Sequence, residues 1–418
     1  MDQFVLSAHR RMRPLSSTIL SKWDIVALAF IFSVLGLVLA AAIPLPSIAC
    51  AQDIGVMLDA GWRYYQGQQC HVDYRSPLGP VFAMLPGIPF KLFGPEYSSL
   101  RFLPLFVTVC IGFWSIALMR NVVPKAVSLV TSLAIGLFSG GLFHPGFAYQ
   151  ALTFATFYNR VAFGLLCIAV IACLIPRSKV AAGRALFVDA SLGVALGIVL
   201  FLKVNFFVFG AVLAGVSLVF NRRTLRSLGV TAAGFVVVSA LIAASFGFRF
   251  DLMLADISMA AAAREGVTYS LFFHPLRNFL ANADYFALSA ILTVVLFFEA
   301  VQAPEHRKTC FIALAVFWMP TLLGYGITLM QSHGDGRCFP TLIAGGAAAC
   351  AWLATDQGVR PLVKNVVAAI VALQAVLVVV PHAAAYQFLT QLRRDSFEGS
   401  FTAEALSAWR VGPFNSYG

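Results

Sequence analysis

The chain has few charged residues. Asp, Glu, Lys and Arg make up 11% of its 418 residues, whereas soluble domains carry about 25%. Hydrophobic residues account for 60% of the chain, and its mean hydropathy is +0.85. This balance excludes an ordinary soluble enzyme. It indicates one integral membrane domain, because too little polar sequence is present to cover several soluble units.

The chain also lacks the short motifs of several large protein classes. Its eight cysteines include no CxxC pair and no Cys/His spacing typical of a zinc site. There is no P-loop, Rossmann glycine pattern, HExxH or GxSxG sequence. Basic and aromatic residues do not alternate over any stretch, so the net charge of +11 does not indicate a nucleic-acid partner. We expect no cofactor; Asp53 and Asp73 would be the only obvious ligands for a divalent cation.

The chain contains many long apolar segments. They approach the roughly 20 residues that a helix needs to span a bilayer, and they predict an all-α multi-pass membrane protein with about 11 transmembrane helices. We expect one transmembrane domain over residues 1–381 and a short outer tail over residues 382–418. The predicted spans are residues 25–43, 102–119, 126–143, 161–176, 186–202, 206–220, 228–247, 285–304, 310–330, 338–354 and 365–381.

A further apolar segment, residues 78–93, determines the orientation of every later span. It is shorter than the others and contains Pro80, Pro86 and Pro89. If it lies along the membrane surface, the short basic loops after it all share the side of the basic N-terminus, as the positive-inside rule requires. We therefore expect an interfacial helix here, a cytoplasmic N-terminus and an outer loop over residues 44–101.

Few charged residues fall inside the predicted spans. Asp189 and Glu299 lie toward the cytoplasmic ends of their spans, where we expect contact with water. Lys203 lies at the outer side, between the spans 186–202 and 206–220. A lysine among apolar residues is costly and indicates a functional role, although its side chain could instead extend to lipid headgroups.

The first outer loop concentrates ionisable groups between Asp53 and Pro80. Its first part has helical character, and its weak apolar face could rest on the membrane; that face comprises Ile54, Met57, Leu58 and Gly61. Cys50 and Cys70 flank this part and could form a disulfide in an oxidising compartment. We expect chemistry or recognition at this loop, because the rest of the protein is mostly hydrocarbon.

The order of features in this loop resembles that of a known family. An acid at Asp53, a helix with small residues, Pro77-Leu78, an apolar helix, Leu92-Phe93-Gly94 and then Arg101 are similar to the first outer loop of the GT-C superfamily. These enzymes are polyprenyl-phosphate-sugar-dependent glycosyltransferases, such as protein O-mannosyltransferases and lipid A aminoarabinose transferases. The resemblance covers roughly residues 20–120.

The resemblance implies a GT-C-like fold in which this loop forms two helices along the membrane. It also implies a function: moving a sugar from a polyprenyl-phosphate donor to an outward-facing glycan, lipid or protein acceptor, at the outer face of a bacterial inner membrane. The acid near the start of the family's loop corresponds to Asp53. Many members carry a second acid near the outer end of the fourth span, where this chain has Phe157-Tyr-Asn159-Arg160 and no acid.

Two carboxylates are the catalytic candidates. Asp53 is a candidate base or acceptor-orienting group, since desolvation near a bilayer makes a carboxylate a better base; it could instead be a helix N-cap. Asp73 is either a second acid of the active site or a turn residue before Ser76-Pro77. Asp59 is expected on a solvated face.

The leaving lipid phosphate needs cations at the headgroup level, and the acceptor needs polar contacts. The candidate substrate-binding residues are Lys203, Arg160, Asn159, His71, Arg75, Arg337 and His274. Two of them also have structural interpretations. Arg337 could pair with Asp335 in a tight turn, and His274 could be an interfacial anchor.

Two other hypotheses remain at this point. A transporter or flippase for a lipid-linked or small anionic substrate would explain the spans and Lys203, but it predicts ionisable residues near the bilayer midplane. A non-catalytic membrane protein with a degenerate GT-C fold is the third hypothesis, because the second acid is missing. The concentration of charge in the outer loops favours the enzyme.

Overall fold

The computed structural model describes residues 51–142, 156–221, 223–262, 282–329 and 340–395, with a few isolated positions elsewhere. All regular structure in these ranges is helical. The helices are α3 (Ala51–Tyr65), α4 (Pro80–Phe93), η1 (Tyr97–Arg101), α5 (Phe102–Met119), α6 (Lys125–Gly140), α7 (Phe157–Leu174), η2 (Arg177–Lys179), α8 (Ala182–Leu202), α9 (Val204–Asn221), α10 (Leu225–Ala244), α11 (Phe250–Ala262), α13 (Ala283–Gln302), η3 (Pro304–His306), α14 (Arg307–Leu329), α15 (Pro340–Leu353) and α16 (Pro361–Asp395).

Among the described residues, 7 helices are long and apolar enough to cross a membrane. They include α5, α7, α8, α10, α13, α14 and most of α16, and shorter apolar helices lie in α4, α6, α9 and α15. This confirms the prediction of an all-α membrane protein. The predicted span 25–43 lies largely outside the described residues.

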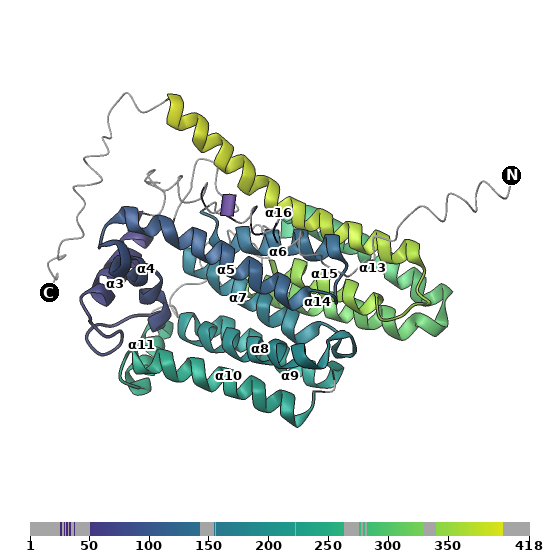
Figure 1. The fold of residues 1–418 in the computed structure, drawn as a ribbon, viewed down its shortest axis with the longest axis horizontal. Coiled ribbons are helices and arrows are strands. Elements are labelled where there is room, and N and C mark those ends of the chain that lie inside the picture. Colours follow the sequence, from purple (N-terminus) through teal and green to yellow (C-terminus); the bar gives the residue numbers. More distant parts are fainter. Residues whose placement is uncertain are drawn as a thin grey trace.

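The helices form one elongated bundle (Figure 1). α7 is the central helix: it packs against α5, α6, α8, α9 and α15, and nearly all of its side chains are buried. Its central place follows from its composition, because α7 carries small and apolar residues on every face. The first turn of α7 therefore lies in the middle of one end of the bundle.

Small residues allow the closest helix contacts, as is usual in membrane proteins. A Cβ atom at Gly193 of α8 would overlap the backbone oxygen of Thr231 in α10, and one at Gly164 of α7 would overlap the Ser139 hydroxyl of α6. Close backbone approach at these positions lets dispersion contacts accumulate along the helices. Glycine is needed there for space.

Adding one methyl group at the α8–α10 contact should destabilise the protein. We expect Gly193→Ala to lower the free energy of unfolding by about 1–3 kcal/mol, the usual cost of overpacking. Thermal unfolding of the purified protein in detergent measures this. Gly229→Ala in α10 is the matched control, because a Cβ there meets nothing within 4 Å; equal stability of the two variants would contradict the packing argument.

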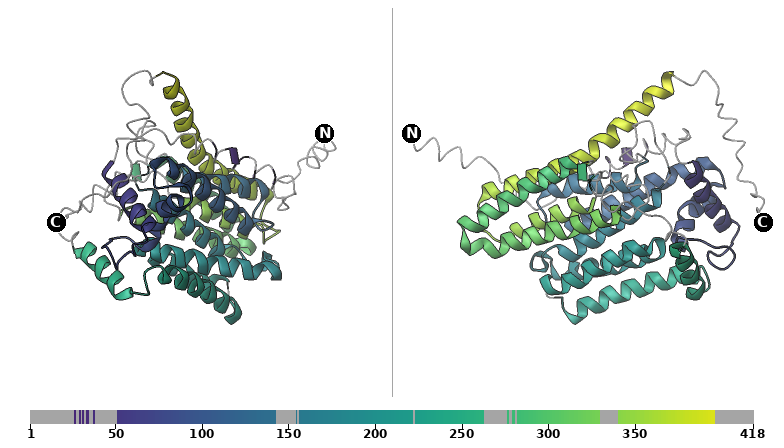
Figure 2. Two further views of the ribbon diagram at one scale, coloured as in Figure 1. Left: turned by 60° about the vertical axis from the view of Figure 1, so that its left-hand side comes forward. Right: turned by 180° about the vertical axis from the view of Figure 1, so that it is seen from behind.

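The helices α3, α4 and α11 lie together at one end of the bundle, which we call the loop end (Figure 2). α4 does not run through the bundle. Phe82 in its first turn contacts Tyr158 at 5.2 Å between ring centroids, and Tyr97, just after α4, contacts Phe154 at 6.1 Å. Tyr158 lies in the first turn of α7 and Phe154 lies three residues before that helix, so the two ends of α4 stay at the same end of the bundle.

The apolar face of α3 packs onto the protein. Ile54, Met57 and Leu58 are buried, and a Cβ at Gly61 would press on Pro86 and Phe90 of α4. The interpretation that this face rests on the membrane was therefore wrong. A sequence pattern shows that a helix has an apolar face, but it does not show which apolar surface covers that face.

Basic residues gather at the opposite end, which we call the basic end. There Asp189 is buried and accepts hydrogen bonds from Arg177 (2.6 Å) and Arg223 (3.1 Å). Buried Glu299 forms an ion pair with the Arg360 guanidinium. It also accepts a hydrogen bond from the backbone N–H of Arg360 at 3.1 Å. The expectation that these two acids contact water was wrong. Buried carboxylates need cationic partners, and here the neighbouring basic loops supply them.

α16 continues past the predicted boundary at residue 381. Its 35 residues run without a break to Asp395, and the helix projects beyond the others at the loop end (Figure 1). Pro381 lies inside it and does not end it. The first part of the predicted tail is thus a continuation of the last apolar helix.

Candidate functional site

Lys203 and Asn159 meet at the loop end. The Lys203 Nζ donates a hydrogen bond to the Asn159 Oδ1 at 2.7 Å. The same ammonium lies 5.3 Å from the ring centroid of Tyr158 and 5.5 Å from that of Phe206, within cation–π range. Asn159 is buried and Lys203 is half-buried. Two of the residues predicted from the sequence to bind substrate are therefore direct neighbours.

The backbone explains how Lys203 reaches this place. Lys203 is the single non-helical residue between α8 and α9, with an extended conformation at φ −160 and ψ 108. On the other side, α7 begins directly after Thr156, which has a left-handed conformation at φ 56. Tyr158, Asn159 and Arg160 consequently occupy the first turn of the central helix, next to the α8–α9 break.

Arg160 is buried one residue further along α7. Its guanidinium carbon lies 5.5 Å from the centroid of the Phe157 ring. Arg160 is also within electrostatic range of His382 in α16, whose Nδ1 donates to the Val378 carbonyl at 2.7 Å. Asn159 and Arg160 are thus consecutive residues in the first turn of α7, and Lys203, at the α8–α9 break, is bonded to Asn159. We call Asn159, Arg160 and Lys203 the cationic cluster.

The first turn of α4 lies over this cluster. Phe82 packs on Tyr158, and Gly79, which precedes α4, approaches so closely that a Cβ there would overlap the Phe201 carbonyl. Phe201 is only two residues from Lys203. The outer loop singled out by its charge pattern and the lysine singled out by its apolar surroundings therefore meet in space.

A second set of contacts anchors the loop itself. The His71 Nδ1 lies 2.9 Å from the Asp256 Oδ2 of α11, and the same carboxylate oxygen accepts the Ser76 backbone N–H at 3.0 Å. Because a carboxylate oxygen only accepts, Nδ1 carries the hydrogen. The His71 Nε2 is buried and has no hydrogen-bond partner among the described residues. The pair joins residues 185 positions apart and fixes the loop on α11.

His71 therefore faces the protein. Its ring also contacts Phe246 at 6.0 Å between centroids, and Phe246 in turn contacts Phe201 at 5.9 Å. These ring contacts connect His71 to Phe201, which precedes Lys203 by two residues. The geometry gives His71 an anchoring contact, separate from the cationic cluster.

Asp256 was not predicted from the sequence, although one signal was available. It is a buried acid in the otherwise mostly apolar helix α11, Phe250–Ala262. Such a residue needs a partner, but the sequence does not say which. His382, a histidine within the apolar run of α16, was missed for the same reason.

Removing the Asp256 carboxylate should loosen the loop. We expect Asp256→Ala to lower the free energy of unfolding by about 1–3 kcal/mol for each buried donor left without a partner, which here are the His71 Nδ1–H and the Ser76 N–H. Thermal unfolding in detergent measures the change. The control is Asp251→Ala on the same helix, which removes an exposed carboxylate that pairs with exposed Arg249. An equal loss of stability in the control would contradict the anchoring role of Asp256.

Asp73 and Arg75 lie on the exposed part of the loop. The Asp73 Oδ2 accepts the Gln69 backbone N–H at 2.6 Å, while the Asp73 N–H donates to the Gln69 carbonyl at 2.9 Å. This is the geometry of a turn residue, the second of its two predicted roles. The Arg75 side chain contacts the Met259 sulfur at 3.4 Å.

The cysteine of this loop is not an activated nucleophile. Burial raises the pKa of the Cys70 thiol to about 11, so it stays protonated at neutral pH. Burial also raises the pKa of neighbouring Tyr74. Cys70 is a free thiol, and Cys50 lies outside the described residues, as do Arg337 and His274.

Asp53 is exposed in the first turn of α3. α3 begins at Ala51, so Asp53 lies inside the helix and is not its N-cap. A carboxylate in a first turn still interacts favourably with the helix dipole, which leaves a structural role open. Asp59, six residues further along α3, pairs with Arg63 at 2.8 Å.

The predicted site residues that the structure describes fall into three groups at one end of the bundle. The cationic cluster is enclosed, the His71 loop is anchored on α11, and Asp53 is exposed on α3. Within the described residues, no group of three or more His, Cys, Asp or Glu side chains could hold a metal ion.

No family model, curated protein or solved structure matches this chain. The functional conclusion therefore depends on the site and on the resemblance in the first loop.

Proposed function

We propose that this protein is a membrane glycosyltransferase of the GT-C type. It moves a sugar from a polyprenyl-phosphate donor to a glycan, lipid or protein acceptor on the outer side of the membrane. The observation that carries the proposal is the cationic cluster at the loop end. An ammonium and a guanidinium are held there beside α4, at the ends of the apolar helices α7 and α8, and a lipid phosphate would lie at that level if these helices cross the membrane.

The proposed topology follows from the helices and the charges. About 11 spans result when the shorter apolar helices α6, α9 and α15 and the segment 25–43 are added to the longer ones. The basic end then faces the cytoplasm by the positive-inside rule, and α3 and α4 lie along the outer surface. In a bacterium, the protein would lie in the inner membrane with its active site facing the periplasm.

The chemistry uses two kinds of group. The acceptor hydroxyl attacks the anomeric carbon, the bond from that carbon to the phosphate oxygen breaks, and polyprenyl phosphate leaves with the bonding electrons. Lys203 and Arg160 stabilise the negative charge that develops on the leaving phosphate. Asp53 orients the acceptor hydroxyl and receives its proton.

Asn159 has a different role from the acid found at this place in many GT-C enzymes. Its side-chain oxygen is already bonded to Lys203, so it positions the ammonium that binds the phosphate. An aspartate at this place would neutralise the ammonium, whereas an amide orients it and leaves its charge available to the donor.

The placement of charge favours an enzyme over a transporter. Within the seven long apolar helices, the charged side chains lie within about two helical turns of a helix end. Arg160 is in the first turn of α7 and Glu299 is in the last turn of α13. A transporter that binds its substrate halfway across the membrane places such groups near the midplane.

The decisive experiment uses the purified full-length protein in lipid nanodiscs with a panel of undecaprenyl-phosphate sugars. We expect release of free sugar from one donor, or its transfer to an added acceptor. A parallel assay in vesicles follows movement of each donor between leaflets. If a donor moves between leaflets with its sugar–phosphate bond intact, the protein is a flippase and the glycosyltransferase proposal is wrong. If no donor is moved or cleaved, both hypotheses are wrong.

A further inference from the structure

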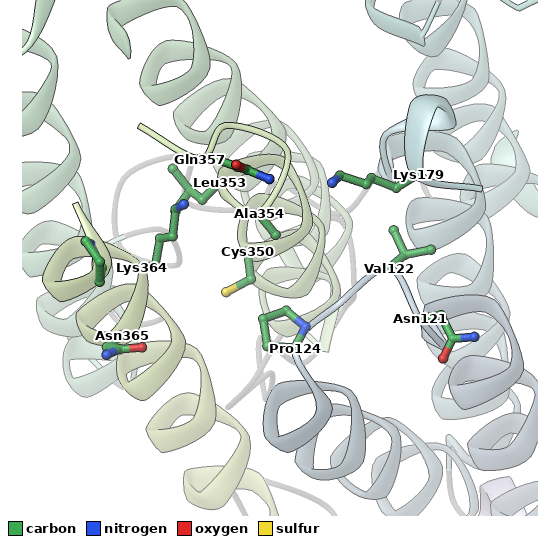
Figure 3. Close-up of a pocket in the computed structure, with 11 residues that line it drawn as sticks. Asn121, Val122, Pro124, Lys179, Cys350, Leu353, Ala354, Gln357, Lys364 and Asn365 are labelled. Atoms are coloured by element: carbon green, nitrogen blue, oxygen red, sulfur yellow. The ribbon is translucent and has the colours of Figure 1, made fainter. Parts of the chain in front are cut away.

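A cavity lies at the basic end, far from the proposed active site. Its volume is about 340 Å³, and it lies between the start of α6, the end of α15, the start of α16 and η2. Five polar side chains line it: Asn121, Lys179, Gln357, Lys364 and Asn365. Lys179 and Lys364 extend toward Gln357 from opposite sides (Figure 3).

The cavity is electropositive. Its lining contains two lysines and no carboxylate, and the two ammonium groups lie within electrostatic range of each other. The Lys364 Nζ donates to the Asp356 carbonyl at 2.6 Å, and the Asp356 carboxylate also lies within electrostatic range of it without lining the cavity. The Asp356 carboxylate itself is bonded to His306, Thr309 and the Gly358 N–H.

Two helix starts reinforce this charge. α6 begins directly after Pro124, and α16 begins at Pro361; both prolines line the cavity. Helix N-termini carry a partial positive charge and favour anions. Like charges repel one another, and an anion between the two ammonium groups would relieve that repulsion. The amides of Asn121, Gln357 and Asn365 can donate to its oxygens.

The remaining walls are apolar. Val122, Cys350 and Leu353 line the cavity, and all three are buried. A ligand that combines an anionic head with carbon atoms fits this lining better than a bare ion does. Basic cavities between transmembrane helices on the cytoplasmic side recognise anionic lipid headgroups in this way.

We propose that this cavity binds a phosphate group, and that the headgroup of an anionic phospholipid in the adjacent leaflet supplies it. Lys179 and Lys364 contact the phosphate oxygens, and the apolar walls cover the glycerol. The site is independent of the glycosyltransferase proposal, because it lies at the other end of the bundle and shares no residue with the cationic cluster.

The test measures binding of dioleoylphosphatidylglycerol to the purified protein, by native mass spectrometry and by the shift in thermal unfolding. Dioleoylphosphatidylcholine and inorganic phosphate are tested in parallel. We expect phosphatidylglycerol to bind and stabilise the protein. We expect the Lys179→Gln/Lys364→Gln variant to bind it about 10- to 30-fold less tightly, since each lysine near an anionic lipid contributes roughly fivefold.

The matched control is Arg226→Gln/Lys308→Gln, which removes two charges from exposed side chains at the same end, outside the cavity. The single variant Lys179→Gln keeps the Lys364 contact and still tests the site if the double variant does not fold. We expect it to lose an intermediate part of the affinity for phosphatidylglycerol. Stabilisation by inorganic phosphate but not by phosphatidylglycerol would assign the phosphate site to a free anion and overturn the lipid assignment. Equal losses in the double variant and its control, or no preference for phosphatidylglycerol over phosphatidylcholine, would overturn the proposal.

Discussion

Lys203→Gln should lower the rate of sugar transfer by about 10²–10³-fold, the usual loss when one group that stabilises transition-state charge is removed. Glutamine keeps most of the length of the side chain and can still bond to Asn159, so the variant removes the charge and leaves the local packing. Its thermal unfolding should match that of the wild type. The rate is measured with the donor that the wild-type protein uses.

Lys91→Gln is the matched control for this prediction. Lys91 is an exposed lysine on α4 at the same end of the bundle, with its ammonium 4.3 Å from the centroid of the Tyr64 ring. We expect it to keep the wild-type rate. Asn159→Ala should cause a smaller loss than Lys203→Gln, because it removes the positioning contact and leaves the ammonium. Wild-type turnover by Lys203→Gln would exclude a role for the cluster in phosphate binding.

Asp53→Asn should lower the transfer rate by about 10²–10⁴-fold, as expected for a missing general base. Donor binding should be retained, since the proposed phosphate contacts come from Lys203 and Arg160. The measurement compares single-turnover transfer rates with donor affinities for the same variant. A selective loss of rate would separate Asp53 from the residues that bind the donor.

Asp59→Asn tests whether this effect is specific. Both acids lie on α3, and Asp59 is paired with Arg63, so this variant changes the same helix without touching the proposed base. If Asp53 only interacts with the helix dipole, Asp53→Asn should leave the rate unchanged and reduce stability by about 0.3–1 kcal/mol. That result would remove Asp53 from the mechanism.

The sequence was sufficient to recognise an all-helical membrane protein. Apolar runs with helical length predicted elements close to those observed, for example 186–202 for α8 at Ala182–Leu202 and 102–119 for α5 at Phe102–Met119. The signal is strong because each segment must satisfy its own backbone hydrogen bonds within the bilayer. The sequence also singled out Lys203. Placing a charged side chain beside an apolar run costs free energy whichever group it binds, so such a lysine stands out without knowledge of its partner.

Contacts between distant residues could be decided only by the tertiary structure. The sequence named Lys203 and Asn159 separately, but the bond between them depends on how α7 packs beside the α8–α9 break. It gave no partner for Asp256, and it placed Asp189 and Glu299 in water when both are in buried ion pairs. Hydropathy and charge are properties of single segments, whereas the partner of a buried charge is set by which helices pack together.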